Sequence, residues 1–183
     1  MKGIIFREFL ELVEDKFGLL AVETVLQEVG SDGVYTTVGS YDHKELVKLI
    51  VSLSKHTGVD VAQLQQVFGE TVFISLYNTI PEGANIKECQ TTFEFIRHVE
   101  DYIHVEVKKL YVDAKPPSFS FISEQESELV FDYYSARCMA DVCLGLVKGC
   151  ANHFGERLSV EKHPIDETGQ NVRFTLIRMP LNG

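Results

Sequence analysis

The segment FEFIRHVEDYIHVEVKKLYVDAKPPSF, residues 93–119, decides how the chain is organised. Its apolar residues recur at steps of three and four, which predicts one amphipathic helix from about residue 93 to 111. Lys115-Pro116-Pro117 ends this helix, because a proline forces extended geometry on the residue before it. The spacing before this segment is helical, and much of the spacing after it is that of strands.

Four stretches before this segment repeat the helical spacing, at about residues 2–17, 20–29, 43–56 and 61–77. Gly18, Gly30 and Gly58 follow the first three and are typical helix ends. Gly69 lies inside the fourth, where a glycine costs about 1 kcal/mol relative to alanine. We expect a tight crossing with another helix at Gly69.

The chain after this segment predicts strands at 118–123 and 129–135, an apolar helix at 138–154, and strands at 157–162 and 172–179. Helices followed by a β-β-α-β-β tail indicate an α+β fold with an antiparallel sheet and one packed helix. The 183 residues suit a single domain. Within it we expect a helical part at about 1–80 and an α/β part at about 81–183.

Charge and composition narrow the partners and the compartment. The formal net charge of −10 disfavours nucleic acid and anionic membranes, which select basic proteins. Charged residues such as Arg7, Glu8 and Glu11 interrupt the first apolar stretch, so it suits neither a signal peptide nor a membrane span. We therefore expect a cytoplasmic protein.

Neither the cysteine spacing nor a search for catalytic motifs indicates a metal site, a disulfide or an enzymatic activity. Cys89, Cys138, Cys143 and Cys150 form no C-x-x-C pair, and their spacing suits neither a zinc knuckle nor a disulfide scaffold. We expect buried or half-buried thiols, and spacing does not reveal a redox role. The chain has no P-loop and no H-E-x-x-H motif, and we find no nucleophile–base pair, so we expect no enzyme.

His104 lies at the edge of the apolar stripe of the long predicted helix, on the same face as Val107 and Tyr111. An imidazole placed there is partly or wholly buried and needs a partner. One interpretation is a hydrogen-bonded core histidine. The other is a metal or haem ligand, because a neutral imidazole on a rigid helix suits that task.

Tyr133, Ser135 and Arg137 alternate along a predicted strand, so their side chains should project from one face. Two hydroxyls and a guanidinium make a set of donors that can hold carboxylates or phosphates. An exposed polar strand face explains the same pattern. Spacing alone does not separate the two interpretations.

Together these residues resemble the H-NOX (haem–nitric oxide/oxygen binding) family, of the stand-alone bacterial type related to the haem domain of soluble guanylate cyclase. The resemblance extends over essentially the whole chain. It is carried by the start at Met1, by Phe68-Gly69, by His104, by Pro116-Pro117-Ser118-Phe119, by Tyr133-x-Ser135-x-Arg137 and by Leu144-Gly145-Leu146. The Tyr-x-Ser-x-Arg element is weak alone and specific in this combination.

The resemblance implies a haem b group between the helical part and the α/β part. It makes His104 the proximal iron ligand, and Tyr133, Ser135 and Arg137 the residues that hold the propionates. It implies that Pro117 packs on the porphyrin and helps to distort it. The remaining residues expected to contact the haem are Ile5, Phe9, Val72, Val142 and Leu146.

The distal residues predict which gas is bound. Oxygen-binding family members have a tyrosine nine residues after the motif tyrosine, where this chain has Val142; the companion polar position is Val72. Without a hydrogen-bond donor the pocket does not stabilise bound oxygen. A donor is worth about 1.5–3 kcal/mol to a charged acceptor. Nitric oxide needs no such help, so we expect a sensor that binds nitric oxide and carbon monoxide and excludes oxygen.

Signalling is expected to occur in trans, through a sensor histidine kinase or a cyclic-di-GMP enzyme, because we find no output domain in this sequence.

Some family members also carry a zinc site. Here Cys138 directly follows Arg137 and no cysteine follows Cys150, so we expect no zinc. The alternatives are an oxygen-binding haem protein and a haem-free module for an acidic ligand. A small haem peroxidase is disfavoured by the apolar distal residues.

Overall fold

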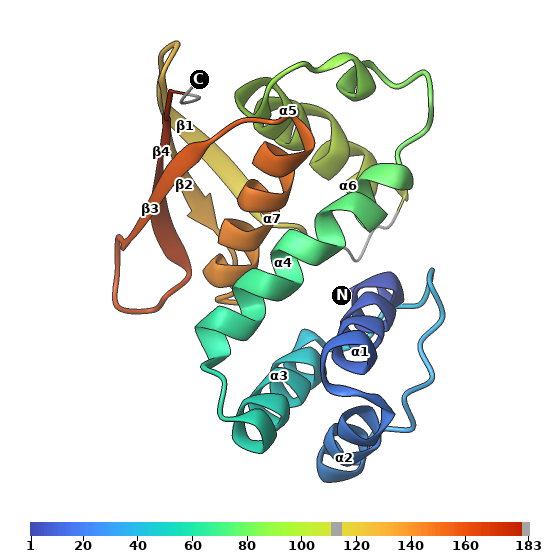
Figure 1. Ribbon diagram of the computed structural model, residues 1–183. Helices are drawn as coiled ribbons and strands as arrows, with labels where there is room; N and C mark the ends of the chain where they lie inside the picture. Colours follow the sequence, from blue (N-terminus) through green and yellow to red (C-terminus); the bar gives the residue numbers. More distant parts are fainter. Residues whose placement is uncertain (111–114, 181–183) are drawn as a thin grey trace.

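The computed structural model describes residues 1–110 and 115–180 (Figure 1). Four helices come first: α1 (Gly3–Phe17), α2 (Leu19–Val29), α3 (His43–Thr57) and α4 (Val61–Asn78). A short 3₁₀ turn, η1 (Asn85–Glu88), then leads towards the segment that carries His104. All four predicted helices are confirmed, with ends within two residues of the prediction.

Local chemistry explains where these helices begin and end. Asp42 and Asp60 cap α3 and α4, because their carboxylates accept from the backbone N–H groups of Lys44 at 3.0 Å and Ala62 at 2.8 Å. Gly30 and Gly58 end α2 and α3 with φ of 73° and 75°, a left-handed conformation that glycine adopts without steric cost. The glycine stops predicted from the sequence are therefore confirmed.

The long helix predicted over residues 93–111 is not one α-helix. It divides into α5 (Thr92–His98), a π-helical segment η2 (Val99–His104) and α6 (Val105–Leu110), and the predicted end at Tyr111 lies outside the described residues. Periodicity did not reveal the π segment, because a wide apolar stripe tolerates the shift that one wider turn introduces. Such π turns are rare and are found frequently at functional sites.

The α/β part has the predicted order of elements. The strands are β1 (Ser118–Glu124), β2 (Glu128–Tyr134), β3 (Leu158–Pro164) and β4 (Asn171–Arg178), with α7 (Ala140–His153) between β2 and β3. They form one antiparallel sheet in the order β1-β2-β4-β3. In Figure 1, α7 lies between this sheet and α4. The α+β class is thus confirmed.

Helices α4 and α7 cross in backbone contact at the glycine that the sequence singled out. A Cβ on Gly69 would overlap the carbonyl oxygen of Val142 and would lie 2.9 Å from the Cα of Gly145. A Cβ on Gly145 would overlap the carbonyl oxygen of Gln66 and would lie 2.8 Å from the Cα of Gly69. The tight crossing predicted at Gly69 is therefore confirmed.

The buried apolar side chains around this crossing form three cores. The first is built by α1–α4 with Met139 from the start of α7, the second by the sheet and α7, and the third by Phe73, Ile86, Phe95 and their neighbours. Because α4 borders both the first and the third core, the predicted division near residue 80 stays a prediction. Among the described residues, no helix has the length and apolar character needed to span a membrane.

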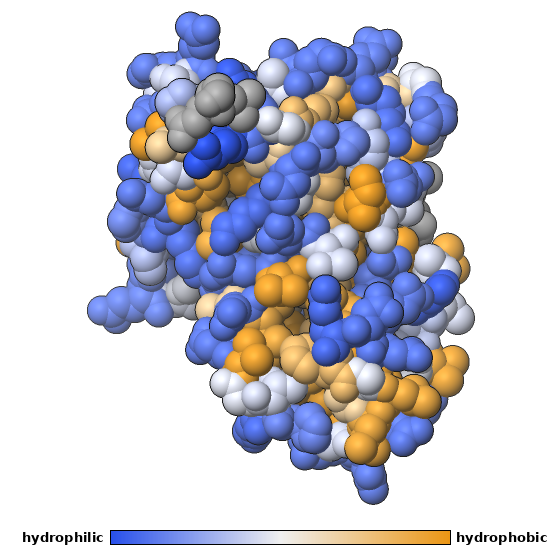
Figure 2. Space-filling view, viewed as in Figure 1, coloured by the Kyte–Doolittle hydropathy of each residue, from blue (hydrophilic) through white to orange (hydrophobic). Residues whose placement is uncertain are grey.

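Apolar side chains also reach the surface of the helical part. Leu19 and Leu20, the first two residues of α2, are 58% and 72% exposed. Figure 2 shows apolar residues gathered on the half of the molecule that α1–α3 occupy, whereas the opposite half presents mainly hydrophilic residues.

Candidate functional site

His104 is the last residue of the π segment, and its ring is held on two sides. The side chain is buried, with 8% of the residue exposed. Its Nδ1 lies 2.8 Å from Oε2 of Glu100, one turn earlier. The Phe119 ring, on β1, packs edge-on against the imidazole with the ring centres 5.2 Å apart.

These contacts fix the chemical state of His104. Burial lowers the pKa of His104, because the charged imidazolium loses its hydration, and the neighbouring Glu100 acts in the opposite direction. We therefore assign a neutral ring whose Nδ1–H donates to Glu100. The lone pair then belongs to Nε2, the arrangement found in most metal-ligating histidines.

Tyr133, Ser135 and Arg137 are brought together, although not by one strand as predicted. β2 ends at Tyr134, so only Tyr133 projects from the strand, whereas Ser135 and Arg137 lie in the turn before α7. The Ser135 hydroxyl accepts from the backbone N–H of Arg137 at 3.3 Å, and the Ser135 N–H donates to the carbonyl of Gln170 at 2.9 Å. The turn thus replaces strand alternation as the device that gathers the three side chains.

Burial dominates the electrostatics of this group. It raises the pKa of Tyr133 well above its usual value, while the Ser135 hydroxyl and the Arg137 guanidinium lower it. Burial also lowers the pKa of Arg137, which is half-buried. The two hydroxyls and the guanidinium therefore remain protonated near neutral pH and are available as donors.

Among the described residues, Arg137 lacks the acidic partner that Arg7, Arg97, Arg173 and Arg178 have. Within the described residues no carboxylate lies at ion-pair distance from its guanidinium, whereas Arg173 pairs with Asp132 through two bonds of 2.7 and 2.8 Å. Burial lowers the pKa of the Met1 amino group and of His43, and the charge of Arg137 lowers both further, so both lie within its field. A half-buried guanidinium without an acidic partner among the described residues favours an anionic ligand.

The apolar residues of the predicted site lie in or against one core. Phe9 and Val72 are buried in the first core, and Phe9 packs edge-on against Phe68 with ring centres 5.4 Å apart. Ile5, Val142 and Leu146 are half-buried against it. Pro117 lies elsewhere, just before β1 and two residues from Phe119, the ring that contacts His104.

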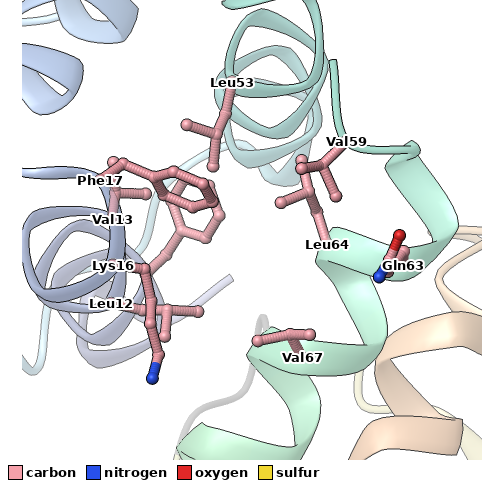
Figure 3. A pocket seen from close by; sticks show the side chains of 10 residues that line it. Leu12, Val13, Lys16, Phe17, Leu53, Val59, Gln63, Leu64 and Val67 are labelled. Atoms are coloured by element: carbon pink, nitrogen blue, oxygen red, sulfur yellow. The ribbon is translucent and has the colours of Figure 1, made fainter. Parts of the chain in front are cut away.

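A separate cavity of about 310 Å³ opens between α1, α3 and α4 (Figure 3). Side chains of α1, including Leu12 and Phe17, face Leu53, Val59 and Leu64 across it. Its lining is apolar except for Lys16 and Gln63. Of the predicted site residues it contains only Phe9, so this cavity is distinct from the group around His104 and Arg137.

The structure adds contacts at the site that the sequence did not predict. Glu100 is not among the predicted site residues, although its i, i+4 spacing to His104 is a usable signal for a hydrogen bond. Phe119 and the Met1 amino group carried no such signal, because chain pairing and folding bring them to the site. The predicted thiol burial holds for Cys89, Cys143 and Cys150, whereas Cys138 is exposed.

Comparison with known proteins identifies the class. The family model described as Haem-NO-binding matches residues 2–162, which is most of the chain. The chain therefore belongs to the H-NOX family, whose domains are haem-based sensors of diatomic gases. A search among curated proteins found no match.

Solved structures agree with this assignment. The unliganded Fe(II) H-NOX protein from K. algicida is 35% identical, with a TM-score of 0.90 and all of both chains covered. The IWP-051-bound H-NOX from Shewanella woodyi in the Fe(II)CO state is 36% identical, with a TM-score of 0.82, and the match covers 100% of this chain and 97% of that one. The S. oneidensis H-NOX protein in the Fe(II)NO state, 22% identical with a TM-score of 0.87 over 98% of this chain and 100% of that one, shares the fold.

Proposed function

We propose that this chain is a nitric oxide sensor that carries haem b on His104 and regulates a separate signalling protein. The observation that carries the proposal is the buried His104, whose Nδ1 lies 2.8 Å from Oε2 of Glu100, so that Nε2 is left for a metal. When bound, a ferrous haem would supply an iron that takes up a diatomic gas.

The residues around His104 suit a haem. Its two propionates are carboxylates, and Tyr133, Ser135 and Arg137 offer two hydroxyls and a guanidinium without an acidic partner among the described residues. Pro117 would pack on the porphyrin from the side of β1. Ile5, Phe9, Val72, Val142 and Leu146 would supply the apolar distal surface.

Selectivity for nitric oxide follows from the distal side chains. Phe9, Val72 and Val142 have no hydrogen-bond donor, so they offer nothing to stabilise the partial charge on bound oxygen. The relative solved in the Fe(II)CO state, which is 36% identical, supports a diatomic ligand for this chain.

Signalling is a change of state and not a chemical reaction. His104 would hold the haem iron, binding of nitric oxide would weaken this bond, and the segment that carries His104 would then relax against β1. A ligand that binds one of two conformations better shifts the population towards it. We propose a sensor histidine kinase or a cyclic-di-GMP enzyme as the partner, and the cytoplasm as the compartment.

Absorption spectra of the reduced protein under anaerobic conditions, then in air, then with nitric oxide, test the proposal. We expect a five-coordinate ferrous spectrum that ignores oxygen and shifts with nitric oxide. A stable oxygen complex would refute the selectivity, and a protein that gains no Soret band with haemin would favour a module for another acidic ligand. In His104→Gly with added imidazole, we expect retained haem and a partner that no longer responds.

A single substitution at Val142 tests the selectivity further. A phenol in Val142→Tyr would donate to bound oxygen, and a hydrogen bond to a charged acceptor is worth about 1.5–3 kcal/mol. We therefore expect oxygen affinity, measured by flash photolysis, to rise by about tenfold to a hundredfold. Val142→Phe is the matched control, of nearly the same size and without the hydroxyl. Equal affinities in the two variants would contradict the prediction.

A further inference from the structure

Glu100 joins the segment that carries His104 to the sheet. Its Oε2 accepts from His104 Nδ1 at 2.8 Å and from the backbone N–H of Phe119 at 2.9 Å. The side chains of Glu100 and His104 are only 21% and 10% exposed. One partly buried carboxylate oxygen therefore holds the imidazole and the edge strand β1 at the same time.

The hydrogen bond from the Phe119 N–H fixes the position of the Glu100 carboxylate. β1 is an edge strand, so some of its backbone N–H groups have no partner strand and need another acceptor. The Glu100 carboxylate accepts from the backbone N–H of Phe119, and the Phe119 ring packs edge-on against His104. The imidazole is thus held by Glu100 and by the residue that Glu100 itself binds. A movement of His104 must disturb the first strand of the sheet.

A carboxylate on Nδ1–H has a defined effect on a ligating imidazole. It fixes the tautomer, orients the ring and raises the basicity of the other nitrogen. The hydrogen bond is charge-assisted, and such bonds are roughly twice as strong as neutral ones. Basicity at Nε2 in turn strengthens the bond to a metal.

We propose that Glu100 is a positioning residue that sets the strength of the bond between His104 and the iron, and hence how readily His104 is released. This inference rests on the proposed function, because it takes His104 as the iron ligand. A weakened Glu100 contact would give a sensor that loses its histidine faster on binding nitric oxide. It would also uncouple His104 from β1.

The competing role for Glu100 is a purely structural link between η2 and β1. Glu100→Gln separates the two roles, because its amide oxygen still accepts a hydrogen bond while the negative charge is lost. Glu100→Asp keeps the charge on a shorter side chain. Glu106→Gln is the matched control, since Glu106 pairs with exposed Lys109 on α6 at 2.8 Å and does not face His104.

The experiment is resonance Raman spectroscopy of the ferrous, unliganded protein, followed by stopped-flow mixing with nitric oxide. We expect the iron–histidine stretching frequency to fall in Glu100→Gln, and more in Glu100→Ala. Histidine release should become about tenfold faster, the lower end of the effect typical of groups that support a metal ligand. Glu100→Asp should recover part of the frequency, and Glu106→Gln should match the wild type.

Two failures are distinguishable. If the wild type binds haem through His104 and all Glu100 variants that fold share its stretching frequency, the role of Glu100 is refuted while the proposed function stands. If the wild type shows no iron–histidine band, both are refuted. Should Glu100→Ala fail to fold, the Gln and Asp variants carry the same comparison.

Discussion

Two helical regions of this molecule are built in opposite ways. Where α4 crosses α7, the backbones touch at Gly69 and Gly145, and side chains bridge the crossing, among them Gln66 to Asp141 at 2.8 Å and Asn152 to Glu70 at 2.8 Å. The segment from Val99 to Leu110 has instead a π turn. Its Tyr102 and Val105 are each 40% exposed.

We call the first region, the crossing of α4 and α7, the frame, and the second region, the segment from Val99 to Leu110, the lever. A helix crossing without intervening side chains has no room to slide, because closely packed interiors resist small displacements. A π turn with exposed neighbours has fewer buried contacts, and regions of that kind open at lower free energy. The proposed iron ligand lies on the second region and not on the first.

The largest effect is expected where the frame is tightest. In Gly145→Ala the new methyl would overlap the Gln66 carbonyl, so the helices must separate, and we expect a loss of about 3 kcal/mol in unfolding free energy. In Gly149→Ala the methyl meets the Glu70 carbonyl oxygen and the Phe73 Cβ, both at 2.7 Å, and the loss should be smaller. Urea titration measures both. Wild-type stability in Gly145→Ala would mean that the crossing is not rigid.

The next effect concerns haem retention and not stability. Arg137→Ala removes the guanidinium that has no acidic partner among the described residues, and a charge-assisted bond is worth about 1.5–3 kcal/mol. We expect haem to transfer to a scavenger protein about tenfold to a hundredfold faster.

Arg173→Ala is the matched control for that experiment. It breaks a paired arginine with 44% of the side chain exposed, so we expect unchanged haem transfer and only a small loss of stability, because solvent screens exposed ion pairs. If the two variants release haem at the same rate, Arg137 does not hold the propionates.

The sequence predicted the frame well because its signals are local. Helix spacing, capping residues and glycine stops act within a few residues, and Gly69 inside an apolar helix indicated the crossing. The lever was predicted less well. The π turn leaves the apolar spacing intact, and the bond from Glu100 to Phe119 joins residues nineteen positions apart, through the fold. For the same reason the turn that gathers Ser135 and Arg137 was read as a continuation of the strand.

The smallest expected effect is a difference in the reactivity of the native cysteines, which compares the two regions without any substitution. Cys89 precedes α5, on the side of the lever, whereas Cys143 and Cys150 lie on α7, in the frame. Burial raises the pKa of all three thiols, that of Cys143 to about 12, so each stays neutral and unreactive until its surroundings open. Cys138 is exposed and should react first.

Pulse alkylation at increasing urea concentrations, followed by mass spectrometry, measures the order in which the cysteines are modified. Cys89 and Cys150 share the third core and are 7% and 2% exposed, so static burial barely separates them. If the lever opens by itself, Cys89 is modified at urea concentrations below the global transition, while Cys143 and Cys150 are modified only with it. Modification of Cys150 together with Cys89 would mean that the frame and the lever open as one unit, and the contrast between the two regions would then not extend to their dynamics.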